Sequence, residues 1–282
     1  MRLGVITDEV SQDFEVALDF AKTYGLDCVE LRSAYEKGPF EYTEADILAI
    51  KALSARYGIP VTAISSPMFK CEYSAENIRI HTESFKRLIG FATILGATKI
   101  RCFDFLKSEA VTHEMIRDAY EEAYRAAEAA GITILIESEP TTNCACCADI
   151  AALVRFVDRP YFKALYDPGN NIYATDEIPF PDGYRAIEGM LAHVHIKDAV
   201  RADGETVATA VGDGAVDYPG IFAELKKIGY EGDIMLETHY RLSGGIDEKT
   251  LKNPKGSAIS DGGYAPSALC MERLLKLLGR DF

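Results

Sequence analysis

The sequence is poor in basic residues. Lysine and arginine together number 30, against 44 aspartates and glutamates, so the formal net charge is −14 at pH 7. Nucleic-acid-binding proteins normally present a basic surface, and anionic membranes also attract basic residues. The acidic balance therefore argues against nucleic acid and against membrane surfaces as partners. A run of 18 apolar residues is also missing from the sequence, so no transmembrane helix is expected.

Histidine is scarce, and cysteine is present in an odd number. The chain has five histidines and seven cysteines. The odd thiol count in a long chain, together with a first segment that lacks a signal-peptide pattern, predicts reduced cysteines and a cytoplasmic protein. Cys144, Cys146 and Cys147 lie close together, but no second CxxC pair accompanies them. We therefore expect a loop and helix start with small buried thiols there, rather than a zinc knuckle.

A glycine-rich dinucleotide-binding fingerprint is missing after the first strand-like segment, which reads VITDEVSQD (5–13). This counts against a doubly wound open sheet. What the sequence does contain is a regular alternation of strand-like and helix-like segments. Strands are predicted over 3–10, 28–32, 61–67, 98–105, 132–140, 162–170, 191–199 and 233–240. Helices are predicted over 13–26, 44–58, 74–96, 112–130, 147–157, 183–190, 218–229 and 267–278. Eight βα units predict an α/β fold, a (β/α)8 TIM barrel formed by a single domain over residues 1–282.

Two connections show no helix or strand pattern. Residues 200–216 are expected to be a loop that contains three glycines. Residues 241–266 form a polar, glycine-rich stretch directly after the eighth predicted strand. Long structureless segments in compact domains are usually functional or disordered. We expect either a lid whose lysines 249, 252 and 255 could meet an anionic substrate, or a packed or oligomer-contacting loop.

Four consecutive predicted strands, the fifth to the eighth, end in side chains that can bind a metal ion: Glu137, Asp167, His195 and Glu237. In a parallel barrel the carboxyl ends of all strands lie on one face, which carries the active site of barrel enzymes. Three carboxylates and one imidazole suit one divalent ion, Mn²⁺ first, with Mg²⁺, Co²⁺, Fe²⁺ and Zn²⁺ as alternatives. His193 points the same way as His195 along its strand, and we assign it no ligand role.

These segments resemble the xylose isomerase-like TIM barrel superfamily, which includes sugar isomerases, ketose 3-epimerases, inosose dehydratases and endonuclease IV-type enzymes (AP endonuclease family 2). The resemblance covers the whole chain. It is carried by VEL (29–31), LIESEP (135–140), LYDPGN (165–170), HVHIKD (193–198) and the long stretch 211–239. It implies the same four metal ligands. Many members have histidine two positions after the fifth-strand Glu and three after the sixth-strand Asp, where this chain has Glu139 and Asn170.

The resemblance also implies the chemistry of a sugar or sugar phosphate isomerase or epimerase. A divalent ion polarises a carbonyl, and a carboxylate removes a proton from the neighbouring carbon. In epimerase-like members the glutamates of strands five and eight are acid and base on opposite faces of that carbon. The matching residues are Glu137 and Glu237. Ketose epimerases place a substrate-contacting arginine six positions after the metal histidine, which here is Arg201, with a solvated loop charge as the other interpretation.

Further substrate contacts are expected near the ends of the same strands. Glu139 and Asn170 replace residues that often face substrate, so they are expected to set which hydroxyl pattern is accepted. His239 lies two positions after Glu237, although a structural hydrogen bond is its alternative role. The remaining candidates are Lys197 and Asp198, which follow His195, and Glu30, which either binds substrate hydroxyls or pairs with Arg32 or Arg101.

Other functions share parts of this pattern. A dehydratase or lyase acting on a keto-sugar or keto-inositol would start with the same proton abstraction and then expel a β-hydroxyl. An endonuclease IV-type repair enzyme needs many histidines for its zinc ions, and the acidic charge opposes it. A sugar-binding barrel without catalysis would not need four intact metal ligands. The expected partner is a small sugar or polyol, and a homo-oligomer is an outcome that we keep open.

Overall fold

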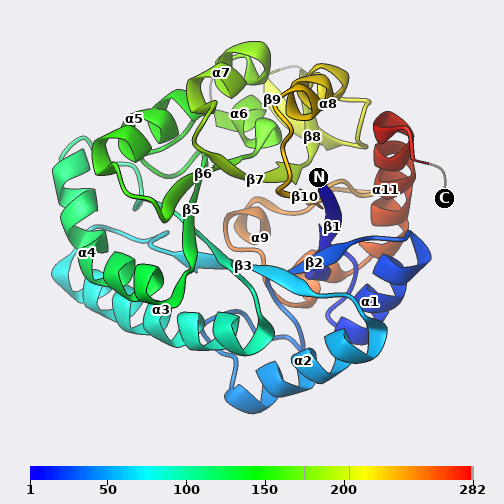
Figure 1. The fold of residues 1–282 in the computed structure, drawn as a ribbon. Helices are drawn as coiled ribbons and strands as arrows, with labels where there is room; N and C mark the ends of the chain where they lie inside the picture. The colour runs from blue at the N-terminus through cyan, green and yellow to red at the C-terminus, as the bar shows by residue number, and fades with distance from the viewer. Residues whose placement is uncertain (175, 203, 281–282) are drawn as a thin grey trace.

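The computed structural model describes residues 1–174, 176–202 and 204–280, and shows a closed barrel of eight parallel strands surrounded by helices (Figure 1). The strands follow the order β1-β10-β7-β6-β5-β4-β3-β2, and β1 closes the ring by pairing with both β10 and β2. They are β1 (Arg2–Ile6), β2 (Cys28–Leu31), β3 (Val61–Met68), β4 (Lys99–Cys102), β5 (Thr133–Glu137), β6 (Phe162–Tyr166), β7 (Leu191–Ile196) and β10 (Asp233–Leu236). The predicted TIM-barrel fold is confirmed.

The helices begin and end where the sequence supplies caps. Thr43 and Ser74 accept hydrogen bonds from the first turns of α2 and α3, while Gly58 and Gly96 end those helices in the left-handed conformation. The helices that follow the strands are α1 (Phe14–Thr23), α2 (Glu44–Tyr57), α3 (Ala75–Leu95), α4 (His113–Ala130), α5 (Cys147–Val157), α6 (Pro168–Ala174), α7 (Tyr184–Ile187), α8 (Tyr218–Lys227) and α11 (Tyr264–Leu278). Among the described helices, none combines the length and apolar character needed to cross a membrane.

The prediction of a plain loop over 200–216 is wrong. Strands β8 (Asp198–Ala202) and β9 (Glu205–Thr209) form an antiparallel hairpin outside the barrel, with Val200 opposite Val207. Gly204 has φ +84°, a conformation that glycine adopts without a steric penalty. The Asp-Gly pair between two β-branched segments was the available signal for this turn.

The segment 241–266 is not structureless either. It contains two short helices, α9 (Glu248–Lys252) and α10 (Ser257–Ser260), and α11 starts within its last residues. Asp247 caps α9 by accepting the backbone N–H of Thr250 at 3.0 Å. In Figure 1 the α9 ribbon lies over the barrel opening.

The sixth βα unit also differs from the prediction. Strand β6 ends at Tyr166, and α6 begins at Pro168, so the predicted strand end over 167–170 is already helix. The short helix predicted over 183–190 is present as the single turn of α7, and a further helical turn, η2 (Pro179–Gly183), precedes it. Another short turn, η1 (Thr7–Glu9), follows β1.

The main apolar core lies between the strands and the helices, whereas the barrel interior is largely polar. A separate small apolar cluster contains Ile6, Cys28 and Met235. Glu30 and His193 are completely buried and are held by strands β2 and β7. Buried polar groups need hydrogen-bond partners, so this interior is built to hold specific contacts.

Candidate metal centre and active site

Four side chains converge at the carboxyl ends of β5, β6, β7 and β10. Glu137 is the last residue of β5, Asp167 follows β6, His195 is the next-to-last residue of β7, and Glu237 follows β10. One donor atom from each residue lies within 4.8 Å of the donors of the other three. All four residues are buried. The structure thus brings together the four residues that the sequence predicts as metal ligands.

The ammonium group of Lys197 lies between two of these carboxylates. Its Nζ is 2.7 Å from Glu237 Oε2 and 2.9 Å from Asp167 Oδ2. Burial alone would lower the pKa of Lys197, but the two carboxylates raise it above its ordinary value. Burial raises the pKa of Asp167 to about 7, because Lys197 offsets only part of the effect and Glu137 adds repulsion. This part of the site therefore demands positive charge, which a divalent ion would also supply.

Two arginines hold the two glutamates. Arg101 Nη1 donates to Glu137 Oε2 at 2.9 Å, and Arg32 Nη1 donates to Glu237 Oε1 at 2.6 Å. Burial acts to raise the pKa of Glu137, but Arg101 and His195 together lower it to about 2. Against the same burial, neighbouring cations hold the pKa of Glu237 well below its ordinary value. Both glutamates are therefore ionised at neutral pH.

His195 faces the four-donor group with one nitrogen and the barrel interior with the other. Its Nδ1 is 2.9 Å from Glu137 Oε1 and 3.4 Å from Glu237 Oε2. Its Nε2 is 3.2 Å from Glu30 Oε2. His193 contacts Glu30 as well and is not among the four donors. Nδ1 is therefore the nitrogen of His195 that is placed to bind a metal ion.

A cavity of about 810 Å³ adjoins these residues. Its lining includes Glu137 and Glu237 and four of the residues predicted to contact substrate, namely Glu139, Asn170, Lys197 and His239. Asp167 is fully buried and is not among the residues that line the cavity. A volume of this size accommodates a sugar and its bound water.

The two residues that depart from the family pattern both face this cavity. Glu139 Oε2 is 3.0 Å from the Nζ of Lys70. The side-chain amide of Asn170 donates to the backbone carbonyl of Ser138 at 2.7 Å. Neither residue belongs to the four-donor group, so both are available to contact a ligand without holding a metal ion.

His239 approaches Glu237 from a left-handed backbone position, with φ 46°. Its Nε2 is 3.3 Å from Glu237 Oε1 and 3.3 Å from Glu9 Oε1, and its backbone N–H donates to Glu9 Oε2 at 3.1 Å. Left-handed conformations are unfavourable for residues other than glycine and need support from their surroundings. Here the contact with Glu9 supplies that support and turns the imidazole toward the cavity.

Three predicted substrate contacts lie elsewhere. Glu30 is fully buried in the barrel interior, where it contacts histidines rather than Arg32 or Arg101. Arg201 lies in the β8–β9 hairpin and does not line the cavity, although its partner Thr206 does. Its side chain donates to the carbonyl of Ile172 and pairs with Asp176. Asp198 accepts hydrogen bonds from the backbone N–H groups of Gly212, Gly214 and Val216 and so fixes the loop after the hairpin.

The model of the xylose isomerase-like TIM barrel family matches residues 18–258 of this chain. The chain belongs to this family. The extension of one domain over all of residues 1–282 stays a prediction.

Relatives within the family are distant in sequence. L-ribulose-5-phosphate 3-epimerase of Salmonella paratyphi C (strain RKS4594) is 24% identical over 231 residues, with 78% of this chain and 80% of the relative covered. The D-psicose 3-epimerase of Clostridium cellulolyticum H10, solved with D-tagatose, has a TM-score of 0.74 at 15% identity and covers 99% of both chains. The IolI protein, solved with a zinc atom, has a TM-score of 0.76 at 15% identity, with 100% of this chain and 99% of that chain covered. These solved structures share the fold.

The segment after β10 forms part of the cavity wall in this family member. Its contribution comes from α9 and the residues on either side of it: Ile246, Leu251, Lys252, Asn253, Pro254 and Lys255. Lys255 pairs with Glu41 at 2.9 Å and so connects the segment to the loop before α2. Of the three lysines predicted to face a substrate, Lys252 and Lys255 line the cavity.

Sequence reasoning missed the basic residues of the site. Arg32 directly follows β2, Arg101 lies within β4, and Lys70 follows β3, and all three line the cavity. Glu9 in η1, which contacts Arg32 and His239, was also missed. The signal was present in the sequence, because these charged residues follow or end strand-like runs as the four candidate ligands do.

Proposed function

We propose that this protein is a divalent-metal-dependent isomerase or epimerase that acts on a sugar or a sugar phosphate. The observation that carries the proposal is the buried four-donor group beside the cavity of about 810 Å³. The curated relative named as an L-ribulose-5-phosphate 3-epimerase supports this class of reaction. The proposed substrate is a small sugar or polyol, and the proposed enzyme acts in the cytoplasm.

The residues present fit a divalent ion. Three carboxylates and one imidazole are buried together. Each carboxylate already attracts a cationic side chain, either Arg101 or Lys197, so its surroundings favour positive charge. An oxygen-rich set with one nitrogen favours Mn²⁺, and Mg²⁺, Co²⁺, Fe²⁺ and Zn²⁺ fit less specifically. When bound, the ion would polarise a substrate carbonyl and stabilise negative charge on its oxygen. Glu137, Asp167, His195 and Glu237 would hold it.

Glu137 and Glu237 are the proposed proton-transfer groups. Strands β5 and β10 are three positions apart in the ring, so the two carboxylates approach from different sides. Their salt bridges with Arg101 and Arg32 keep them ionised, as a base must be. Entry of substrate would displace water and raise their basicity. One glutamate then removes a proton from the carbon beside the carbonyl, and the other returns a proton to the opposite face.

Substrate binding is assigned to the cavity-lining residues Glu139, Asn170, Lys197 and His239. Their side chains offer acceptors and donors that suit hydroxyl groups. We assign no substrate contact to Glu30, Asp198 or Arg201, because none of them lines the cavity.

The test is turnover in D₂O. Protein stripped by a chelator and reloaded with Mn²⁺ is incubated with ketoses, aldoses and their phosphates, and deuterium is located in the product. We expect deuterium on the carbon next to the carbonyl, no activity before reloading, and a loss of kcat of about 10²–10⁴ in Glu137→Gln and Glu237→Gln. Metal occupancy is measured in each variant, because both residues are also proposed ligands.

Each alternative has a distinct outcome in the same experiment. A product lighter by one water would identify a dehydratase. Isomerisation without solvent deuterium would indicate a hydride shift between carbons and would contradict the two-carboxylate mechanism. Full activity in metal-free protein would contradict the proposed metal dependence.

A further inference from the structure

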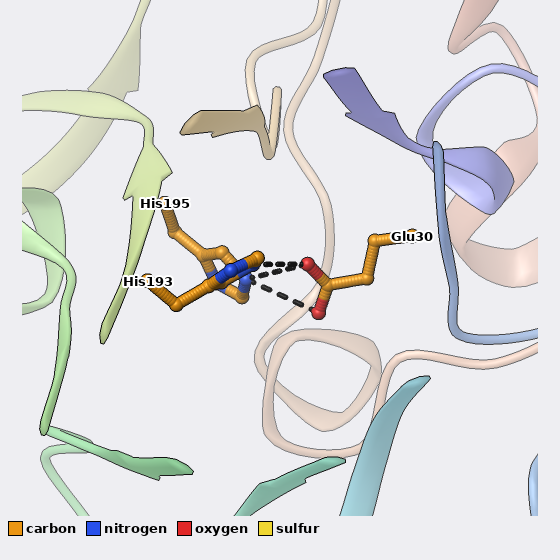
Figure 2. A group of neighbouring side chains, drawn as sticks. All are labelled: Glu30, His193 and His195. Atoms are coloured by element: carbon orange, nitrogen blue, oxygen red, sulfur yellow. Dashed lines mark hydrogen bonds and ion pairs between the residues drawn. The ribbon is translucent and has the colours of Figure 1, made fainter. Parts of the chain in front are cut away.

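Next to the four-donor group, deeper in the barrel interior, lies a second polar cluster that the proposed reaction does not use. It consists of Glu30 from β2 and His193 and His195 from β7, and none of the three side chains is exposed to solvent. Figure 2 shows the two imidazoles pointing from β7 toward the Glu30 carboxylate across the barrel interior. A buried carboxylate with two imidazoles needs a physical reason, because burial of such groups is unfavourable without partners.

The contacts of Glu30 form a complete set of hydrogen bonds. His193 Nε2 is 2.6 Å from Oε2, and His195 Nε2 is 3.2 Å from Oε2 and 3.3 Å from Oε1. The hydroxyl of Ser65 donates to Oε1. An ionised carboxylate only accepts hydrogen bonds, so the imidazole nitrogens that face it must carry their protons. Glu30 therefore selects the tautomer of both histidines with hydrogen on Nε2.

With Nε2 holding its proton against Glu30, a metal ion could bind His195 only through Nδ1, where it would take the place of a proton. Nδ1 is the atom that faces Glu137 and Glu237, at 2.9 and 3.4 Å. Metal-binding histidines usually donate their second N–H to a carboxylate or a carbonyl, which fixes the ring and raises the basicity of the ligand nitrogen. We propose that Glu30 is a positioning residue that presents Nδ1 of His195 to the metal ion, with His193 holding Glu30 in place.

His193 has no second function in this arrangement. Its ring meets the ring of His195 edge-on, with centroids 5.3 Å apart and planes inclined by 75°. Its Nδ1 has no hydrogen-bond partner among the described residues, and the carboxylate that faces it, Oδ2 of Asp233, is 3.9 Å away. The shortest of these contacts of His193 is thus the one with Glu30, and it holds the Glu30 carboxylate in place.

A second metal ion is the competing role for this cluster. One donor atom from each of Glu30, His193 and His195 lies within 4.8 Å of the others. However, the carboxylate oxygens already receive hydrogen bonds from three side chains, and the one from His193 is 2.6 Å long. Metal stoichiometry separates the two roles, since the positioning role predicts one ion per chain and a second site predicts two.

The inference rests on the proposed metal site. The experiment therefore distinguishes failure of the positioning role of Glu30 from failure of the metal site itself. Zn²⁺ and Mn²⁺ affinities are measured by competition with a chromogenic chelator for wild type, Glu30→Gln and Asp104→Asn. Asp104→Asn is the matched control, because Asp104 is also a fully buried carboxylate, whereas the hydrogen bonds of His195 within the described residues go to Glu30 and Glu137. We expect affinity to fall about 10–100-fold in Glu30→Gln and to be unchanged in Asp104→Asn.

A second readout can be taken on wild-type protein alone, so it does not require that the variant folds. Wild-type protein labelled with ¹⁵N-histidine and loaded with Zn²⁺ should show His195 protonated on Nε2 and bound to metal through Nδ1. In zinc-loaded Glu30→Gln the Nε2–H signal of His195 should shift, because the carboxylate that accepts this hydrogen is gone.

The outcomes are distinct. Unchanged affinity in Glu30→Gln, metal on Nε2 of wild-type His195, or two ions per chain would overturn the positioning role while the proposed function stood. Failure of wild-type protein to bind either metal would overturn the proposed function itself, and the positioning role with it.

Discussion

At the scale of single residues, Lys197 and a divalent ion compete for the same carboxylates. Lys197→Met keeps the length of the side chain and removes the charge that lies 2.7 Å from Glu237 and 2.9 Å from Asp167. Without this counter-ion the carboxylates repel one another in the metal-free protein, so we expect Mn²⁺ to bind about tenfold more tightly, a change of about 1.4 kcal/mol. Turnover should fall, because Lys197 is also a proposed substrate contact.

The control for this prediction is Lys70→Met. Lys70 lines the cavity and pairs with Glu139, which is not a candidate ligand, so Mn²⁺ affinity should stay the same. Isothermal titration of both variants measures the difference. Weaker Mn²⁺ binding in Lys197→Met would mean that the ammonium orients the carboxylates rather than competing with metal.

Glu139 and Asn170 should determine which sugar is accepted. Both line the cavity, and neither belongs to the four-donor group. Glu139→Ala and Asn170→Ala should therefore raise KM or change the preferred sugar by roughly one order of magnitude, the scale of one or two lost hydrogen bonds, while each chain still binds one ion. Steady-state kinetics on a sugar panel and metal analysis check this together. Loss of metal from either variant would show that the set of ligands is larger than four.

Asp104 should make the stability of the protein depend on pH. Its carboxyl group is fully buried in the protein interior. Burial raises the pKa of Asp104 from 3.8 to about 6, because Cys144 and Thr142 offset only part of the effect. The folded state then holds this proton more tightly than the unfolded state does. The stabilisation of the folded state that comes from the Asp104 proton is therefore complete below about pH 4 and is lost as the pH rises to about 6.

The size of this effect follows from the shift of about two pKa units, which corresponds to roughly 3 kcal/mol of unfolding free energy. Urea unfolding between pH 4 and pH 7 measures it. Asp104→Asn should remove this part of the pH dependence, because the amide stays neutral. An identical pH profile in wild type and Asp104→Asn would show that water or motion hydrates the carboxylate.

At the scale of elements, the segment after β10 depends on one glycine for its attachment. Gly256 has φ 66° and ψ −164°, a region that is essentially limited to glycine. A Cβ atom there would lie 2.7 Å from Oε2 of Glu36, and that carboxylate accepts hydrogen bonds from both the backbone and the hydroxyl of Ser257. Gly256→Ala should loosen α10 and, with it, the cavity wall formed by residues 251–255.

We therefore expect Gly256→Ala to raise KM about tenfold, with metal binding unchanged, since the four candidate ligands lie on other elements. This corresponds to about 1.4 kcal/mol, within the cost of one strained residue. Gly262→Ala is the control, because Gly262 also has positive φ in this segment but its Cβ would meet no atom within 4 Å. An equal rise of KM in both variants would trace the effect to backbone strain in general rather than to α10.

At the scale of the whole molecule, the barrel was predictable because alternating segments allow few topologies, and the strand ends fixed where Glu137, Asp167, His195 and Glu237 meet. What the sequence did not reveal depends on pairing between distant segments. Arg32 reaches Glu237 across 205 positions, and Glu30 reaches His193 across 163. Local pattern carries no information on such contacts. The β8–β9 hairpin that carries Arg201 differs in this respect, because its turn signal, an Asp-Gly pair, is local in the sequence.

The charge of the whole site leads to the last prediction. Six buried acids surround it, against three buried cations: Asp8, Glu9, Glu30, Glu137, Asp167 and Glu237 against Arg32, Arg101 and Lys197. Burial raises the pKa values of Asp8 and Asp167, and the carboxylates around His195 raise its pKa against burial, so protons compensate part of this imbalance in the metal-free fold. A divalent ion would take over that role. A metal ion at a free concentration of 100 times its Kd stabilises the folded state by about 2.7 kcal/mol. This corresponds to a rise in Tm of about 5–10 °C at this chain length.

Calorimetry of chelator-treated protein, with and without Mn²⁺, measures this shift. Sodium chloride at matched ionic strength should give a much smaller change, because screening acts weakly on buried charges. Glu237→Gln removes one proposed ligand and should lose most of the Mn²⁺-dependent rise in Tm. Glu139→Gln is the matched control, since it changes a cavity-lining carboxylate outside the four-donor group and should keep the rise. Equal Tm values for wild-type protein with and without Mn²⁺ would contradict a metal site at the ends of β5, β6, β7 and β10.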